Sequence, residues 1–462
     1  MNHTPMVSPF SIRNVRLFIM FRVFFNARFY YPIFTILFLD FGLTLEQFAL
    51  LNVAWAVTIV LLEVPSGALA DTLGRRNLLV FTGILMVMEM ALLCFVPRGN
   101  ANILFGVFLL NRILSGAAEA AASGADEALA YDSLQEEGCE TKWGQVLERQ
   151  MRMQAAAFLI AMSLGAAVYD PALMQRIIDF FGLEFTASRE LTLRLPVFLT
   201  LGMAVLTLLT ALLMREVRPA PSGRPLNIVI GSGKRVLQAF KLTLEAGGWI
   251  LNTPFALVII LIGVVFDSCL RMAATLTSQY YRLIHLPEAS FGLIGSTIAV
   301  MGLFVPRLAL ILVEKRTPLF NLIVMTVPAL IGLVGMALFL PTLVGVIPIV
   351  LISSTMYLLR FFQSHYLNRI TTSDQRATVL SFKGLSMNLA YGIVGVLYSL
   401  LVSRLRSTMV PAVTGATPEK LEEAAFTAAM GWFPWAFAAT LAVVMAYVVW
   451  MFRRAGQTEQ QS

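Results

Sequence analysis

The chain has 462 residues, of which 58% are hydrophobic and only 13% are charged, and its mean hydropathy is +0.77. Water-soluble domains carry about twice that share of charged residues, so the composition excludes a soluble globular protein. The net charge of +7 is better explained by cytoplasmic loops rich in lysine and arginine than by a nucleic-acid-binding surface.

Apolar runs of spanning length recur along the whole chain and predict an all-α membrane protein with about twelve transmembrane helices. A polar stretch near the middle divides the chain into a six-helix bundle at 1–214, a cytoplasmic loop with an amphipathic helix at 215–253, and a second bundle with a short tail at 254–462. The predicted spans are 15–39, 45–70, 78–96, 103–123, 154–168, 195–214, 255–280, 291–313, 320–340, 343–362, 379–402 and 433–452.

The basic residues predict the orientation. Most of them fall on one side of the membrane under this assignment of spans, which places both termini and the central loop in the cytoplasm. Arg176, Arg189 and Arg194 are exceptions, because they fall in a loop on the opposite side. We therefore expect a multi-pass protein of the cytoplasmic (inner) membrane.

The loop between the second and third spans contains the segment GALADTLGRR, with Gly67, Asp71, Gly74, Arg75 and Arg76 at fixed spacing. This segment resembles the signature loop of the major facilitator superfamily, bacterial type, although Thr72 stands where that family usually has a basic residue. Together with the two halves of about six spans, the resemblance covers nearly the whole chain. It implies two pseudo-symmetric bundles that work by alternating access.

The resemblance also implies a gating role for this loop. Asp71 would lie at the N-terminus of the eleventh span, where the helix dipole stabilises a carboxylate. Asp71 and Arg76 would then hold the two halves together on the inner side while the protein faces outward. Gly67 and Gly74 would keep the turn tight.

The fourth span carries Arg112, Glu119 and Asp126, seven residues apart, which predicts one polar helix face. Arg112 and Gly116 also resemble the Arg-x-x-x-Gly motif of drug/proton antiporters, in which the arginine is associated with proton coupling. A buried salt bridge that only holds helices together is the alternative interpretation. Asp126, with the neighbouring Glu127 and Asp132, is expected to form an ionic latch with Arg149 and Arg152.

Ionisable residues within other spans are functional candidates because charge is costly in the bilayer. Glu63, Arg28 and Arg360 belong to this group, as do Asp267 and Arg271, which are four residues apart and can pair within one helix. Glu89 is expected to be a satisfied structural residue. Which residues of the first span face a cavity stays open.

We expect a proton-coupled secondary transporter of a small-molecule solute, and the resemblance favours efflux of a drug or metabolite. A proton symporter that imports a nutrient or anionic metabolite is the alternative. A non-transporting sensor or partner protein on the same scaffold is the alternative from another class. We expect no enzymatic activity, no cofactor, no metal site, no nucleic-acid binding and a monomeric protein in the lipid bilayer.

Overall fold

The computed structural model describes residues 8–217, 241, 245, 247–371, 373–409 and 417–459, and these residues form helices and loops without a strand. The chain divides into two compact units. Unit 1 comprises Met1–Ile33, Thr58–Ala239 and Glu288–Ser296, and unit 2 comprises Phe34–Val57, Phe240–Pro287 and Thr297–Ser462. The amphipathic helix predicted in the central loop falls largely outside the described residues, and the predicted domain boundaries stay a prediction.

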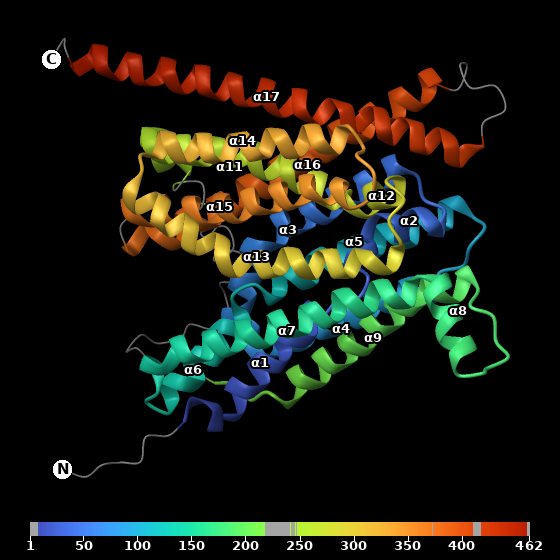
Figure 1. Cartoon of the computed structure of the whole chain (residues 1–462). Coiled ribbons are helices and arrows are strands. Elements are labelled where there is room, and N and C mark those ends of the chain that lie inside the picture. The colour runs from blue at the N-terminus through green and yellow to red at the C-terminus, as the bar shows by residue number, and fades with distance from the viewer. Residues whose placement is uncertain are drawn as a thin grey trace. The chain divides into compact units, whose positions relative to one another are not determined.

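In unit 1, α4 packs between α5 and α9, while α1 lies against α6, α7 and α9 (Figure 1). Its elements are η1 (Pro9–Ser11), α1 (Arg13–Asn26), η2 (Tyr31–Ile33), α4 (Arg75–Phe95), α5 (Ala101–Ala122), α6 (Ala125–Glu136), η3 (Glu140–Lys142), α7 (Trp143–Tyr169), α8 (Pro171–Phe180) and α9 (Arg189–Leu213), with the later part of α3 (Leu45–Leu73) and the start of α13 (Glu288–Lys315).

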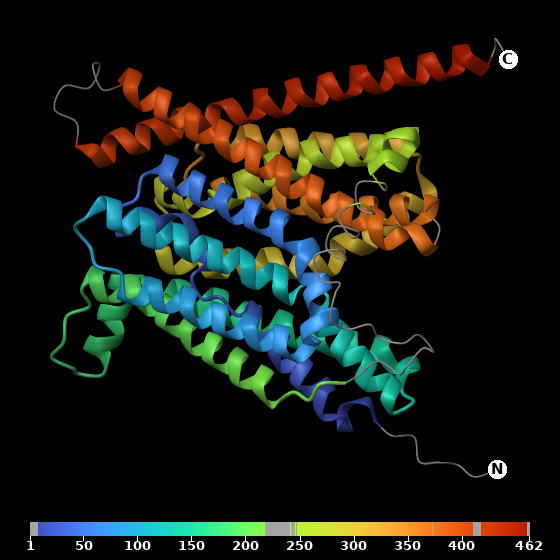
Figure 2. The same ribbon diagram turned by 180° about the vertical axis from the view of Figure 1, so that it is seen from behind.

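In unit 2, α11 packs against α15, α16 and α17, and α14 packs against both α15 and α17. Figure 2 shows the chain from behind. Its elements are α2 (Phe34–Phe41), the start of α3, α11 (Pro254–Thr275), α12 (Thr277–Leu283), most of α13, α14 (Pro318–Ala337), η4 (Thr342–Gly345), α15 (Val346–Ile370), α16 (Ser373–Met409) and α17 (Pro418–Glu459).

Among the described residues, 11 helical stretches are long and apolar enough to cross a membrane, and they correspond to the second to twelfth predicted spans. The first span is not among these candidates because it is broken. Its helix α1 ends at Asn26 and α2 begins at Phe34, so the prediction of one continuous helix over 15–39 was wrong. The expected all-α architecture of about twelve spans is confirmed once the broken span is counted.

The break in the first span is held by contacts inside unit 1. Phe29 donates its backbone N–H to the hydroxyl of Thr200 on α9, at 3.1 Å, instead of to a helical carbonyl. Pro32 has no N–H to donate, which makes it compatible with the irregular stretch. Gly165 on α7 lies so close that an added Cβ would be 1.8 Å from the Phe29 carbonyl oxygen. The break therefore depends on tertiary contacts as well as on local sequence.

A buried ion pair anchors the same stretch. Arg28, which follows directly after α1, forms a salt bridge with Glu89 of α4, and both side chains are almost fully buried. The Arg28 guanidinium also donates to the Tyr30 hydroxyl at 3.2 Å, while Asn111 of α5 donates to the Glu89 carbonyl at 2.7 Å. Glu89 Oε2 is buried without a hydrogen-bond partner among the described residues, so the expectation that Glu89 is a satisfied structural residue holds for its ion pair with Arg28 but not for this oxygen.

The seventh span has a matching interruption at Leu276, between α11 and α12. In unit 2 this junction meets the start of α2. The Ser278 hydroxyl accepts from the backbone N–H of Thr35 at 2.9 Å, and the Thr35 hydroxyl donates to the Thr275 carbonyl at 2.5 Å. The two broken helices thus supply partners for each other's terminal backbone groups, which would otherwise be costly in a membrane.

The helix of the fourth span ends close to its predicted limit and does not continue to Asp126. Helix α5 ends at Ala122, Gly124 takes a left-handed conformation with φ of 77°, and α6 begins at Ala125. Asp126 is therefore on a different helix from Arg112 and Glu119, and the predicted single polar face of three residues was wrong. A glycine in the left-handed region allows the chain to change direction without the strain that a Cβ would add.

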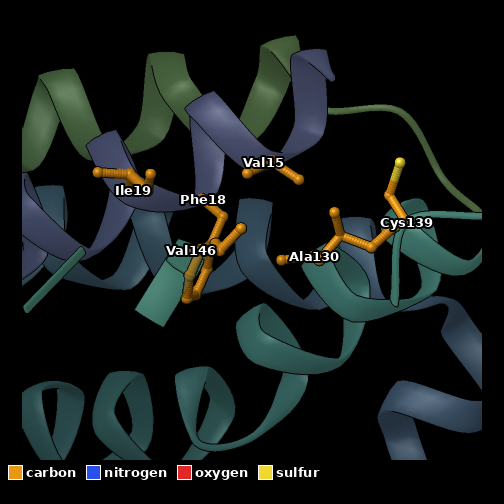
Figure 3. Close-up of a cluster of buried hydrophobic side chains, with 7 residues drawn as sticks. Val15, Phe18, Ile19, Ala130, Cys139 and Val146 are labelled. Atoms are coloured by element: carbon orange, nitrogen blue, oxygen red, sulfur yellow. The ribbon is translucent and has the colours of Figure 1, made fainter. Parts of the chain in front are cut away.

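A buried apolar cluster ties α1 to α6 and α7 at the end nearest the N-terminus, and Figure 3 shows its side chains converging between these elements. Buried Cys139, which forms no disulfide, belongs to this cluster, so it acts as a small packing residue. The cluster fixes α6 beside α1 and so decides which charged groups of the two helices meet. Its members are Val15, Phe18, Ile19, Ala130, Leu134, Cys139 and Val146.

We predict that Gly165→Ala destabilises the protein by about 1–3 kcal/mol, because the new methyl group would collide with the Phe29 carbonyl. Gly202→Ala is the matched control, since an added Cβ there meets no atom within 4 Å. Thermal unfolding of both purified variants in detergent measures the difference. Equal melting temperatures for the two variants would contradict the close contact between α7 and the break.

We also predict that Glu89→Gln lowers the free energy of unfolding by about 3–5 kcal/mol, because it leaves the Arg28 charge buried and uncompensated. The double variant Arg28→Leu/Glu89→Leu is expected to recover part of that loss. Glu148→Gln removes the exposed Arg152–Glu148 pair and should cost no more than about 0.5 kcal/mol. Similar losses for Glu89→Gln and Glu148→Gln would show that the buried pair is not structural.

Candidate functional site

The predicted loop of the gating motif is shorter than expected, because α3 continues to Leu73 and only Gly74 separates it from α4. Gly74 has φ of 90° and stands at the N-terminus of α4, where an added Cβ would be 2.7 Å from the Glu216 carboxylate. Glu216 accepts from the backbone N–H of Arg75 at 3.0 Å and of Arg76 at 2.8 Å, so it caps the helix. A side chain at position 74 would disturb both this cap and the backbone.

The two arginines of the motif bind inside unit 1. Arg75 forms an ion pair with Asp132 of α6. Arg76 donates to the carbonyls of Met214 at 2.8 Å and Leu212 at 3.0 Å, which caps the C-terminal end of α9. The side chains of residues 67–73 are outside the described set, so the expected contact between Asp71 and the eleventh span stays a prediction.

Asp126 is held by the first span. Its carboxylate is 2.5 Å from Arg22 Nε on α1, and Arg22 Nη2 donates to Glu127 at 2.9 Å. The expected latch to Arg149 and Arg152 was wrong: Arg152 pairs with Glu148 on its own helix, and Arg149 is exposed. The reason is the packing of α6 onto α1 and α4, which brings Arg22 and Arg75 to its acidic residues.

Arg112 and Glu119 lie on α5 close to the broken first span. Arg112 is buried and lies within electrostatic range of the Tyr30 hydroxyl. The Glu119 side chain is exposed, Arg28 and Arg22 act on it electrostatically, and its carboxylate forms no hydrogen bond or ion pair with the described residues. Half-buried Glu63 of α3 is a second carboxylate within electrostatic range of Glu119. Glu119 thus differs from Asp126, whose carboxylate has a direct ion-pair partner.

Unit 2 holds the second group of predicted residues. Asp267 and Arg271 form the expected salt bridge within α11, so that prediction is confirmed. Arg271 also donates to the Asn388 side chain at 2.9 Å, and its guanidinium lies 5.0 Å from the Tyr391 ring centroid. These contacts orient one guanidinium with a carboxylate, an amide and an aromatic face.

Sequence reasoning missed the contribution of α16 to this group. Lys383, Asn388 and Tyr391 come from that helix. The half-buried Lys383 ammonium lies within electrostatic range of Asp267 and of Arg360. A lysine within an apolar span is itself a functional signal. Lys383 lies within the predicted eleventh span, 379–402, and could have been named as a candidate for this reason. Arg360 on α15 is exposed.

Three ion pairs join helices from opposite halves of the sequence, each inside one unit, at the ends of spans remote from the basic loops. We call them the outer ion pairs. In unit 2, Arg282 of α12 makes a bidentate contact with Asp40 of α2 at 2.7 Å for both bonds, and Arg406 of α16 is 2.8 Å from Glu46 of α3. In unit 1, Arg189 of α9 binds Glu288 of α13 at 2.6 Å.

Two of the three basic residues on the side predicted to be extracytoplasmic, Arg189 and Arg194, have structural partners. Arg189 is neutralised by Glu288, and its guanidinium lies 4.2 Å from the Tyr169 ring centroid. Arg194 donates to the carbonyls of Cys94 at 2.5 Å and Val96 at 3.0 Å, where α4 ends. Both arginines therefore have structural partners, so they weigh less against the predicted orientation.

No group of three or more histidine, cysteine, aspartate or glutamate residues that could hold a metal ion occurs in the described part of the chain. The arrangement consists of one accessible carboxylate region in unit 1, one guanidinium-centred polar region in unit 2, and the outer ion pairs. Such groups can bind a polar solute, move a proton or hold a conformation. Each role fits a transport protein.

Comparisons with known structures give the fold. The chain is similar to a bacterial homologue of the human lysosomal transporter Spinster in an inward-facing, unoccupied conformation, with 15% identity, a TM-score of 0.66 and 97% of each chain covered. It is similar to the nucleoside transporter NupG, with 13% identity, a TM-score of 0.64 and coverage of 95% of this chain and 99% of that one.

A third similar structure is a D-xylose–proton symporter, with 13% identity, a TM-score of 0.59, and coverage of 94% of this chain and 96% of that chain. At these identities the structures show a shared fold. A search of curated protein sequences gave no match. The profile of the Major Facilitator Superfamily matches residues 17–395, which is most of the chain. The chain therefore belongs to the major facilitator superfamily.

Proposed function

We propose that the chain is a proton-coupled secondary transporter that moves a small-molecule solute across the cytoplasmic membrane by alternating access. The outer ion pairs are the observation that carries this proposal. Each connects a helix of the first sequence half with a helix of the second half at the same end of the spans. Contacts of this kind close one side of a transporter and must break when that side opens.

The exposure of the outer ion pairs supports a reversible role. The side chains of Arg282 and Arg189 are 28% and 35% exposed, whereas those of Arg28 and Glu89 are 3% and 0% exposed. A partly hydrated pair contributes up to about 1 kcal/mol, while removing one partner of a buried pair costs about 3–5 kcal/mol. The Arg282–Asp40 and Arg189–Glu288 pairs can thus open within a conformational cycle, whereas the Arg28–Glu89 pair is suited to stay formed.

Glu119 is our first choice for the coupling residue. It is accessible, it has no ion-pair partner among the described residues, and Glu63 lies within electrostatic range of it, so a proton can reach this region and change its charge. Arg28 and Arg22 supply positive charge within electrostatic range of Glu119. Asp126 is less suited, because Arg22 already holds it at ion-pair distance.

Export is the proposed direction, with the cytoplasm as the side of both termini. The resemblance of Arg112 and Gly116 to the antiporter motif supports export. The guanidinium, amide and ring around Arg271 support a polar or partly aromatic solute, because these groups offer hydrogen bonds and a π face. In the alternative, import by proton symport, the same groups would bind a solute that moves in the opposite direction across the membrane.

The proposal predicts that purified protein in liposomes releases a preset pH gradient when a transported compound is added. Amphiphilic compounds and metabolites are screened with a pH-sensitive dye inside the vesicles. Glu119→Gln should abolish compound-dependent proton movement by removing the titrating group, and Glu137→Gln, an exposed carboxylate at the far end of α6, should leave it unchanged.

Two results would contradict the proposal. Radiolabelled compound that equilibrates without proton movement would indicate a uniporter or another coupling ion. No movement of compound or proton with any member of the library would favour a membrane sensor on the same scaffold.

A further inference from the structure

One of the outer ion pairs differs from the other two in its charge balance. Arg406 faces two carboxylates, with Nη2 2.8 Å from Glu46 Oε1 and Nη1 2.5 Å from Glu422 Oε1. Arg282 and Arg189 each face one carboxylate across the halves. The group at Arg406 therefore carries one uncompensated negative charge when both carboxylates are ionised.

Three of the four carboxylate oxygens of this group have no hydrogen-bond donor in good geometry, although the backbone N–H of Leu45, at the start of α3, contributes a hydrogen bond to Glu422. Both carboxylate oxygens of Glu46 and Oε2 of Glu422 are buried without a donor among the described residues, because Arg406 approaches Glu46 at ion-pair distance but not in hydrogen-bond geometry. The Tyr398 hydroxyl is buried and unpartnered, and both carboxylates act on it electrostatically. A buried acceptor without a donor costs about 1–3 kcal/mol.

Among the described residues, no second basic side chain pairs with this group, and the N-terminal end of α3, where Leu45 and Glu46 lie, adds only a partial positive charge. Asp40 on the neighbouring α2 is already bound by Arg282. The segment 410–416, which joins α16 to α17, contains no charged residue in the sequence. The other charged residues on the adjoining ends of α16 and α17 are exposed: Arg404, Glu419, Lys420 and Glu423.

We propose that this group binds one proton in the closed conformation, shared between Glu46 and Glu422 and hydrogen-bonded to Tyr398. The proton comes from water on the side of the outer ion pairs and adds to one carboxylate, which removes the excess charge and supplies the missing donor. When that side opens, α3 separates from α16 and α17, and the proton returns to water. The outer closure is thus stabilised by acid and weakened as pH rises.

The inference rests on the proposed function, because it assumes that the outer side opens and closes. It assigns to the closure a proton site separate from the region around Glu119. Two proton-binding regions at different depths would let the outer pH act on the conformational step itself, independently of solute binding.

The test measures the distance between two spin labels in purified protein without substrate. The labels are placed at exposed positions of unit 2, Leu50→Cys on α3 and Lys420→Cys on α17, after the three buried native cysteines are replaced by alanine. We expect a short-distance, closed population at pH 5 that decreases several-fold by pH 8. A single proton site limits the change in the opening equilibrium constant to tenfold per pH unit.

Glu422→Gln is expected to keep the closed population at pH 8 and to remove its pH dependence, because one neutral and one charged side chain then balance Arg406. Asp40→Asn is the matched control. It breaks the Arg282 pair and should reduce closure at every pH without changing the pH dependence. Tyr398→Phe should reduce the closed population at pH 5 by removing the hydroxyl.

Three outcomes would overturn the inference. The first is a wild-type distance distribution that does not change with pH. The second is a pH dependence in Glu422→Gln and in Glu46→Gln that equals that of the wild type. The third is closure at pH 8 that is induced by sodium ions in place of protons. The measurement needs no substrate. A normal pH response in a protein that transports nothing would support this inference and contradict the proposed function.

Discussion

The cost of placing charge in a membrane is the constraint on which the arrangement of this protein depends. Isolated charges inside a bilayer are expensive, so each needs a partner, water or a titratable proton. The chain uses these solutions at different places. Arg28 and Glu89 form a dry pair, the outer ion pairs are partly hydrated, and Glu119 is exposed. The degree of exposure distinguishes the buried Arg28–Glu89 pair from the charges for which we propose a role in the transport cycle.

Broken helices are the second consequence of this constraint. The interruption of the first span places Arg28 at Glu89 and brings backbone groups to Thr200, and the junction in the seventh span exchanges hydrogen bonds with the start of α2. Irregular backbone at membrane depth is tolerated where protein groups satisfy it. In transporters, such discontinuous helices commonly line the binding region. Their presence here agrees with the position of the candidate residues.

Much of the fold could be predicted from the sequence. The apolar runs predicted eleven of the helices because hydropathy measures what a spanning helix needs, and the local Asp267–Arg271 pair followed from helical spacing. The break after Asn26 could not be predicted, because apolar residues continue through it and its hydrogen bonds come from a distant helix. Gly124 ended α5 where a continuous helix was expected, since a glycine alone does not reveal its backbone conformation.

The pairing of charges was also beyond the sequence. Asp126 and Arg22 are 104 residues apart, and Arg282 and Asp40 are 242 residues apart, so only the packing of α6 on α1 and of α12 on α2 brings them together. Lys383 was overlooked for a different reason, because the start of its helix had been assigned to another role. Candidate residues could be named from their unusual position in a span, but their partners required the fold.

Cross-linking of the outer closure tests the central claim most directly. Asp40→Cys and Arg282→Cys, in a background without the native cysteines, are joined by a short thiol-specific linker that can be cleaved by reduction. The linker holds together segments that must separate when this side opens. Alternating access predicts that transport stops after cross-linking and returns after reduction, while each single-cysteine variant treated in the same way stays active. Undiminished transport by fully cross-linked protein would contradict the account.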